Sequence, residues 1–142
     1  MLWRVDEHEA VTERGWDGVL VRDAITDIVA DAEAAERHGF WPGHPLNDVA
    51  EHERLCSLYL GSAGMILGLS QLGCSLDCAT AATETIVRYR AVPDFGSDAH
   101  PPSFWMGESG LLMVAEKVGA SAADRGRLRR LVRENRSHPT WS

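Results

Sequence analysis

The chain has 142 residues, 44% of them hydrophobic and 25% charged, with a formal net charge of -7. This balance is typical of one folded domain over residues 1–142 and argues against a largely disordered chain. The negative charge argues against nucleic acid or an anionic membrane as a partner, and no apolar stretch reaches the roughly 18 to 20 residues of a membrane helix. The acidic beginning does not resemble a signal peptide, so a cytoplasmic location is expected.

The first half of the chain predicts three helices after a leader segment, 1–20. Residues 22–38 form an amphipathic helix that Gly39 stops, and the prolines and glycine of 40–48 indicate a loop. A second helix, from about Glu51 or Arg54 to Leu72, is nearly apolar on all sides and should be buried. Asp77 is the expected N-cap of a third, polar-faced helix over 78–90.

Two more helices follow the loop 94–102. Residues 104–118 are mostly apolar and end at Gly119, and Ser121 to Asp124 is a variant capping box that opens an arginine-rich helix to about Asn135. This last helix is expected to be an outer, solvated helix, with binding of phosphate or an acidic peptide as the alternative. Its arginines are Arg125, Arg127, Arg129, Arg130 and Arg133, with Leu128, Leu131 and Val132 turned inward.

The segments 57–73 and 103–119 repeat one pattern of serine, G-x-x-G and a closing glycine. The motif glycines are Gly61 and Gly64 in the first copy and Gly107 and Gly110 in the second. Since glycine lowers helix stability by about 1 kcal/mol relative to alanine, its repeated use favours a packing role, in which a neighbouring backbone approaches closely. A phosphate-binding loop would also need a preceding strand and a Lys-Ser/Thr pair, which the sequence lacks.

Polar-faced and buried helices alternate along residues 21–140, with no convincing strand. Each buried helix needs cover on most sides, so the fold class is all-α, with helical hairpins stacked as an α/α array or partial toroid.

Four motifs resemble lanthionine synthetase C-like proteins in their order and spacing: Trp41 to Asp48, Ser57 to Gly64, Pro102 to Gly110 and Asn135 to Thr140. The resemblance covers about residues 21–140 and implies a toroid of seven hairpins, of which this chain supplies the first two inner helices. The family uses zinc, held by two cysteines and a histidine, to activate a thiol that adds to dehydroamino acids in a peptide.

The zinc ligands and the acid/base histidine of the family lie in later repeats, beyond the matched region. No catalytic, metal-binding or cofactor-binding residue is therefore carried over, and whether the chain is an enzyme stays open. The expected function is that of an N-terminal fragment of such a protein, inactive alone. The alternatives are a small helical scaffold that binds a peptide or protein, and a carboxylate-dependent glycoside hydrolase on an α/α frame.

Three residues are weak pocket candidates: Glu108, His44 and Trp105. Glu108 is either a pocket acid, paired with Asp94 or Asp98, or a charge stabilised by a helix N-terminus. His44, between two prolines, is expected to fix its loop by hydrogen bonds. Trp105 belongs to a set of aromatic residues that either line one end of the array or pack inside it: Trp41, Tyr59, Phe104 and Trp105.

The three cysteines, an odd number, fit reduced thiols better than a disulfide framework. Cys56 is expected to be a small buried residue, and Cys74 with Cys78 gives only a weak indication of a metal site.

A short array leaves apolar edges uncovered, so the expected partners are a second copy or the missing C-terminal half. The inner faces predicted to be uncovered include Leu58, Ile66, Leu69, Leu111 and Val114.

Overall fold

The computed structural model describes residues 15–42, 54–94 and 102–136. In these ranges it contains the helices α1 (Gly18–Ala35), α2 (Ser62–Leu72), α3 (Cys78–Ala91), α4 (Glu108–Val118) and α5 (Arg125–Arg136). The described residues form no strand, and their β-type pairing is a single bridge between Arg37 and Phe40. The predicted all-α fold class is confirmed. In the same ranges, no helix combines the length and hydropathy needed to span a bilayer.

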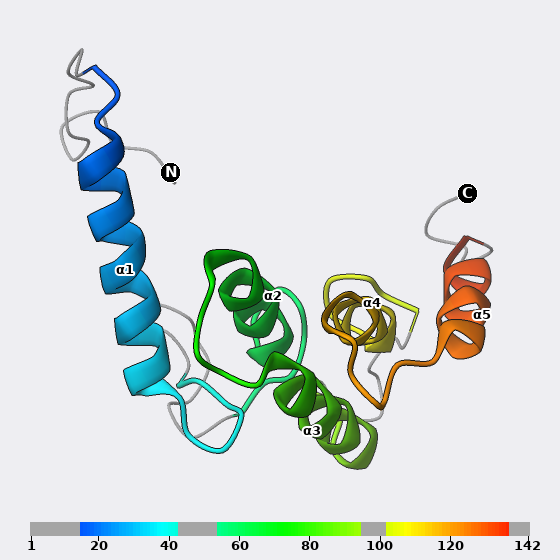
Figure 1. The fold of residues 1–142 in the computed structure, drawn as a ribbon. Coiled ribbons are helices and arrows are strands. Elements are labelled where there is room, and N and C mark those ends of the chain that lie inside the picture. The colour runs from blue at the N-terminus through cyan, green and yellow to red at the C-terminus, as the bar shows by residue number, and fades with distance from the viewer. Residues whose placement is uncertain (1–14, 43–53, 95–101, 137–142) are drawn as a thin grey trace, which may run out of the picture.

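The helices of the two repeat copies, α2 and α4, lie against each other, and α3 packs against both (Figure 1). On the far side of α4 lies α5, whereas α1 stands apart at the opposite end and touches mainly α2. The core between the packed helices is built from fully buried aliphatic side chains, among them Ile66, Ile86, Leu111, Leu112 and Leu131.

Both repeat helices begin later than the hydropathy pattern predicts. Gly61 and Gly107 are their N-caps, and both have extended backbone with φ of -132° and -120°. The apolar residues before each glycine form a turn instead of helix, which hydropathy alone cannot distinguish from a helical start. The predicted starts of these two helices, at residue 51 or 54 and at residue 104, were therefore wrong.

The predicted packing role of the glycines is confirmed at Gly61, Gly64 and Gly110. A Cβ atom on Gly64 would lie 2.3 Å from the carbonyl oxygen of Leu58, and one on Gly110 would lie 2.0 Å from that of Phe104. A Cβ on Gly61 would lie 2.4 Å from the Leu55 carbonyl. No side chain fits at such separations, so each helix folds directly against the turn that precedes it.

The first helix starts and ends earlier than predicted. It begins inside the segment expected to be a leader, because the Asp17 carboxylate accepts hydrogen bonds from the N–H groups of Val19 and Leu20. It ends at Ala35, because His38 and Gly39 both adopt positive φ, 56° and 78°, in a tight turn.

The later helices match their predictions more closely. Asp77 caps α3 as expected, accepting a hydrogen bond from the Thr80 N–H. The cap of α5 is different: the Asp124 carboxylate accepts from the Arg127 N–H at 2.8 Å. The predicted cap Ser121 instead places its hydroxyl 3.3 Å from that of Thr83.

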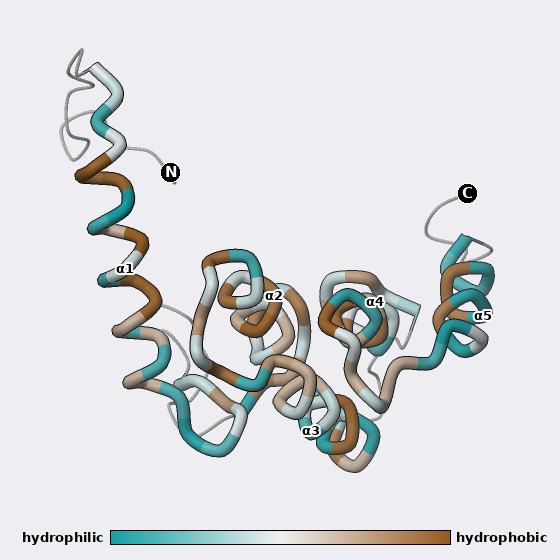
Figure 2. The backbone as a smooth tube through the Cα atoms, in the orientation of Figure 1, coloured by the Kyte–Doolittle hydropathy of each residue, from teal (hydrophilic) through white to brown (hydrophobic). Residues whose placement is uncertain are grey.

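The inner faces that were expected to be uncovered are buried. Leu58, Ile66, Leu69, Leu111 and Val114 are all at most 8% exposed, because α3 covers both repeat helices and α5 covers α4. Exposed apolar side chains lie elsewhere, among them Met65 and Leu72 on α2, Val87 on α3, several along α1, and Val132 on α5, which was predicted to face inward. Figure 2 shows apolar and polar positions mixed along α1, whereas α5 is mostly polar.

Candidate functional site: paired turns with exposed aromatic residues

The turn before each repeat helix is built in the same way. The Gly61 N–H donates to the Ser57 carbonyl at 2.9 Å, and the Gly107 N–H donates to the Ser103 carbonyl at 3.0 Å. Each serine hydroxyl also accepts from a turn N–H, that of Leu60 or of Met106. Equivalent residues of the repeat thus form equivalent turns.

A hydrogen bond joins the two turns directly, from the Tyr59 N–H to the Trp105 carbonyl at 3.0 Å. The two residues occupy the same position in the two copies. Their rings meet edge to face with centroids 6.4 Å apart, and the Phe104 ring meets that of Trp105 at 5.1 Å. These three side chains, here called the aromatic surface, come from both copies and keep one another in place.

The aromatic surface is open to solvent. Tyr59 is 69% exposed, Trp105 58% and Phe104 39%. Large aromatic side chains that gather outside the core mark contact sites more often than isolated exposed ones do. Of the two alternatives for these residues, packing inside the array does not hold for Tyr59 and Trp105.

Trp41, the fourth aromatic of the predicted set, takes part in a different contact. Its indole N–H donates to the Ala32 carbonyl of α1 at 2.7 Å. The neighbouring Phe40 ring is buried, with the guanidinium groups of Arg54 and Arg88 each within 6 Å of its centre. Trp41 therefore helps to hold α1 to the core.

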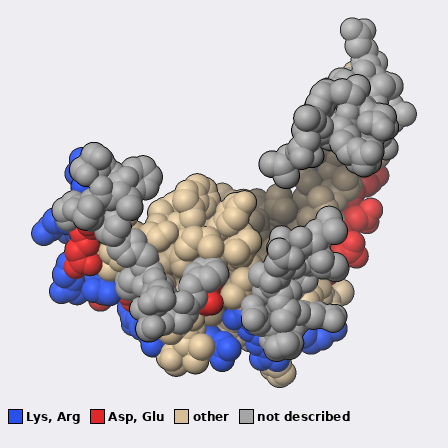
Figure 3. Space-filling model, turned by 180° about the vertical axis from the view of Figure 1, so that it is seen from behind, with Lys and Arg blue, Asp and Glu red and all other residues tan. Residues whose placement is uncertain are grey.

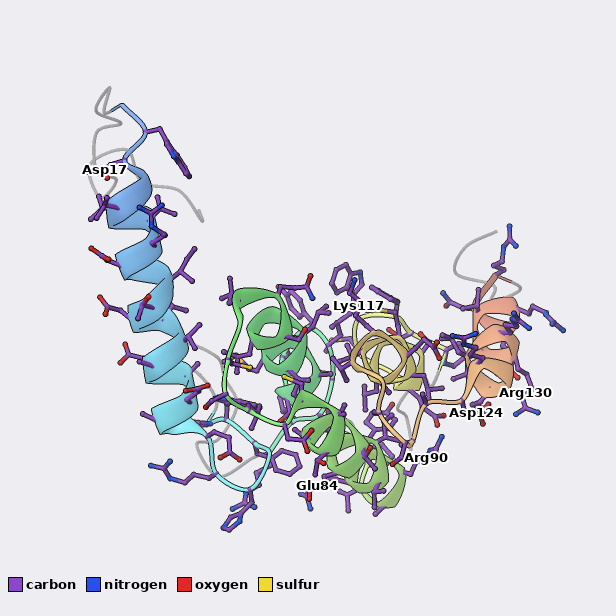
Figure 4. The ribbon with its side chains drawn as sticks, in the orientation of Figure 1. Asp17, Glu84, Arg90, Lys117, Asp124 and Arg130 are labelled. Atoms are coloured by element: carbon purple, nitrogen blue, oxygen red, sulfur yellow. The ribbon has the colours of Figure 1, made fainter. Side chains whose placement is uncertain are left out.

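Glu108 is buried and paired with two arginines. Its Oε1 accepts from the Arg90 Nε at 2.8 Å, and its Oε2 accepts from the Arg127 Nη2 at 2.9 Å and Nε at 3.1 Å. Arg90 lies in the last turn of α3 (Figure 4) and Arg127 on α5, so this carboxylate of α4 links three helices. This pairing could not be predicted from the sequence, because neither arginine lies on the helix that carries Glu108.

Asp94 also has a defined structural partner. Its carboxylate accepts hydrogen bonds from the backbone N–H groups of Cys56 and Ser57, the shortest at 2.7 Å. In the hydrolase alternative, Glu108 pairs with either Asp94 or Asp98 as the acid and base. Both Asp94 and Glu108 are instead bound to other groups within the fold. The other proposed partner, Asp98, and the pocket candidate His44 lie outside the described residues.

Tyr89 lies close to both carboxylates and was not anticipated from the sequence. It is 3% exposed, and its hydroxyl has no hydrogen-bond partner among the described residues. Burial raises the pKa of Tyr89 to about 12, with smaller contributions from the charges of Asp94 and Glu108.

The cysteines fall into two environments. Cys56 is fully buried, as predicted, and burial raises the pKa of its thiol to about 12. Cys74 and Cys78 are half-buried, with their Sγ atoms 3.6 Å apart. Within the described ranges, no group of three or more His, Cys, Asp or Glu side chains is placed to hold a metal ion.

The arginines of α5 differ in their contacts. The exposed Arg125 pairs with the half-buried Glu116, and Arg127 pairs with the buried Glu108. Arg129 and Arg130 are exposed, and Arg130 lies on the side of α5 away from α4 (Figure 4). The helix is therefore partly a solvated outer helix and partly an anchor for α4.

Comparisons of the chain with protein-family models, with curated proteins and with solved structures found no match. The resemblance to lanthionine synthetase C-like proteins stays a prediction.

Proposed function

We propose that this chain forms part of a lanthionine synthetase C-like helical array and binds a peptide at the aromatic surface, without catalytic activity of its own. The observation that carries the proposal is that equivalent residues of the two repeat copies, Tyr59 and Trp105, are hydrogen-bonded to each other yet keep their rings exposed. The repeat, the motif order and the hairpin packing support the array.

The aromatic surface suits an extended peptide for two reasons. Tyr and Trp offer large contact areas with few rotatable bonds, so little conformational entropy is lost when they bind. The hydrogen bond between the turns fixes the spacing of the two rings before a ligand arrives, which lowers the cost of binding further. Apolar side chains of a peptide would pack against the rings.

A binding screen on an array of immobilised unstructured peptides tests this proposal, followed by titration of the best peptide. Tyr59→Ala and Trp105→Ala should each weaken binding at least about tenfold, as the loss of a central aromatic contact does. Trp16→Ala is the matched control, since Trp16 is 85% exposed but lies outside the aromatic surface. Equal affinity in all three variants, or no peptide bound by the wild-type protein, would contradict the proposal.

Zinc has no role in this proposal. The resemblance implies zinc ligands only in later repeats, and the described residues offer no set of three ligands. Metal analysis that found one tightly held zinc per chain would contradict the proposal that the chain has no catalytic activity of its own.

The glycoside hydrolase alternative has little geometric support. A general acid must give a proton to the substrate, whereas both oxygens of Glu108 already accept hydrogen bonds from arginines inside the fold. Asp94 faces backbone N–H groups of the first turn.

We propose that self-association uses α1. This helix has no buried residue, and its exposed side chains include Val19, Leu20, Ile28, Asp23, Asp27 and Asp31. Figure 3 shows acidic side chains along α1 and basic ones at the opposite end, over α5. The complementary charges favour α1 of one copy against α5 of a second copy.

Charge reversal tests this contact. Asp27→Arg with Asp31→Arg, and separately Arg129→Asp with Arg130→Asp, should each sediment as monomers, while an equal mixture of the two variants associates. Wild-type protein that sediments as a monomer at every concentration and at low salt would contradict it.

A further inference from the structure

Cys74 and Cys78 are held close together by the ends of two helices. Gly73 ends α2 in the left-handed conformation, with φ of 82°, and Cys74 follows it directly. Cys78 is the first residue of α3, whose N-cap Asp77 accepts hydrogen bonds from the Thr80 N–H and hydroxyl. The segment between the thiols is therefore fixed from both sides.

The two Sγ atoms are 3.6 Å apart, in van der Waals contact. A disulfide bond is about 2.05 Å long, so the sulfur atoms need to approach by only about 1.5 Å. Since Cys74 lies before the helix that Cys78 begins, rotation of its side chain and small adjustments of residues 74–77 can supply this movement without unwinding α3.

The pair is reachable from solvent. Both thiols line an open surface pocket of about 310 Å³, together with Ser70, Gln71 and Lys117. Lys117 projects from α4 near α2 (Figure 4) and lines the same pocket. Cys56, in contrast, is fully buried in the core.

We propose that Cys74 and Cys78 form a reactive dithiol site that low-molecular-weight disulfides convert reversibly into an intramolecular disulfide. The Cys74 thiolate attacks one sulfur of the small disulfide, forming a mixed disulfide and releasing one small thiol. Cys78 then loses its proton to solvent and attacks the Cys74 Sγ, releasing the second small thiol. The two cysteines lose two electrons and two protons, and the small disulfide gains them.

Oxidation at this site affects the attachment of α1. Ser75 lies between the two cysteines, and its N–H and hydroxyl both donate to the Glu33 carboxylate of α1. A bond between Cys74 and Cys78 reshapes the segment that makes this contact. The disulfide form is therefore expected to hold α1 less firmly than the dithiol form.

Native protein incubated with oxidised glutathione, then alkylated and analysed by mass spectrometry, tests the site. The expected product has lost two hydrogen atoms, links Cys74 to Cys78, and returns to the dithiol with reduced glutathione. Cys56→Ser should give the same bond. Cys74→Ser and Cys78→Ser should yield at most a mixed disulfide with glutathione, and circular dichroism checks that both variants are folded.

Three results would overturn the proposal. These are wild-type protein that stays unmodified, wild-type protein that stops at a mixed disulfide, and a disulfide that involves Cys56. If the proposal holds, the pair should react with a thiol reagent at least about tenfold faster than Cys56, because Cys74 and Cys78 line an open pocket whereas Cys56 is fully buried.

Discussion

The two copies of the repeat share one backbone design but are held by different neighbours. In both, an extended glycine precedes the helix and a left-handed glycine ends it. At the first helical position, the Ser62 hydroxyl donates to Leu55 within its own segment, whereas Glu108 binds arginines of α3 and α5. The repeated residues thus set the unit, and the residues that differ decide which elements attach to it.

The supports of the two turns also differ, but in the opposite direction. In the first copy, the N–H of Cys56 needs a partner and finds it in Asp94, beyond the end of α3. The equivalent residue in the second copy is Pro102, which has no N–H. There the Ser109 hydroxyl donates to the carbonyls of Pro102 and Ser103. The first turn is therefore held from outside the copy and the second from within it.

Substitution of the glycines that both copies share should have the largest effect. Gly110→Ala is expected to lower the free energy of unfolding by about 2 to 3 kcal/mol, and Gly64→Ala by slightly less, because each new methyl group overlaps a turn carbonyl. Urea unfolding followed by circular dichroism measures both.

Gly68→Ala is the matched control for these variants. Gly68 lies inside α2, and a Cβ there would meet nothing within 4 Å. Alanine should therefore stabilise the protein, by up to about 1 kcal/mol. A Gly110→Ala protein as stable as wild type would mean that α4 does not fold against its turn.

Loss of the Glu108 charge should have the next largest effect. Glu108→Gln is expected to lower the free energy of unfolding by about 1.5 to 3 kcal/mol, because two arginines lose a charged acceptor at a buried position. The corresponding change in the first copy, Ser62→Ala, removes one neutral hydrogen bond and should cost about 1 kcal/mol.

Glu116→Gln controls for the loss of an ion pair as such, since the pair of Glu116 with Arg125 is exposed. Its effect should be much smaller and should shrink further in high salt. If Glu108→Gln and Glu116→Gln destabilise the protein equally, the three-helix link around Glu108 is not important for stability.

The features that the sequence predicted are those with a local cause. Asp77 caps α3 and Gly73 and Gly119 end their helices, because each effect acts within a few residues of the chain. The partners of Glu108 and Asp94 were not predictable, since periodicity identifies neighbours on one helix but not contacts between helices. The start of α2 was missed because an apolar turn and an apolar helix have the same composition.

The external support of the first turn gives a smaller, local effect. Asp94→Asn should lower the free energy of unfolding by about 1 to 2 kcal/mol, because one amide oxygen replaces a carboxylate that accepts from two N–H groups. Hydrogen exchange should become faster at Cys56 and Ser57 but stay unchanged in the turn of the second copy. Unchanged exchange at Cys56 would show that its N–H has another partner.

Tyr89→Phe should have the smallest effect at neutral pH, within about 1 kcal/mol of wild type, because the lost hydroxyl has no partner among the described residues. A difference should appear in alkali. The pKa of Tyr89 is raised from 10 to about 12, mainly by burial and then by Asp94 and Glu108, which hold the two copies. The contribution of the neutral Tyr89 side chain to the free energy of unfolding is fully present below pH 10 and is lost as the pH rises toward 12. Urea unfolding at increasing pH should therefore show the stability of Tyr89→Phe rising relative to wild type only above pH 10.

Cys56 and Cys78, whose pKa values are also raised, are present in both proteins and cancel in the comparison. A constant difference across this range would mean that the Tyr89 hydroxyl is solvated or bonded in the folded protein, and that the two copies do not enclose it.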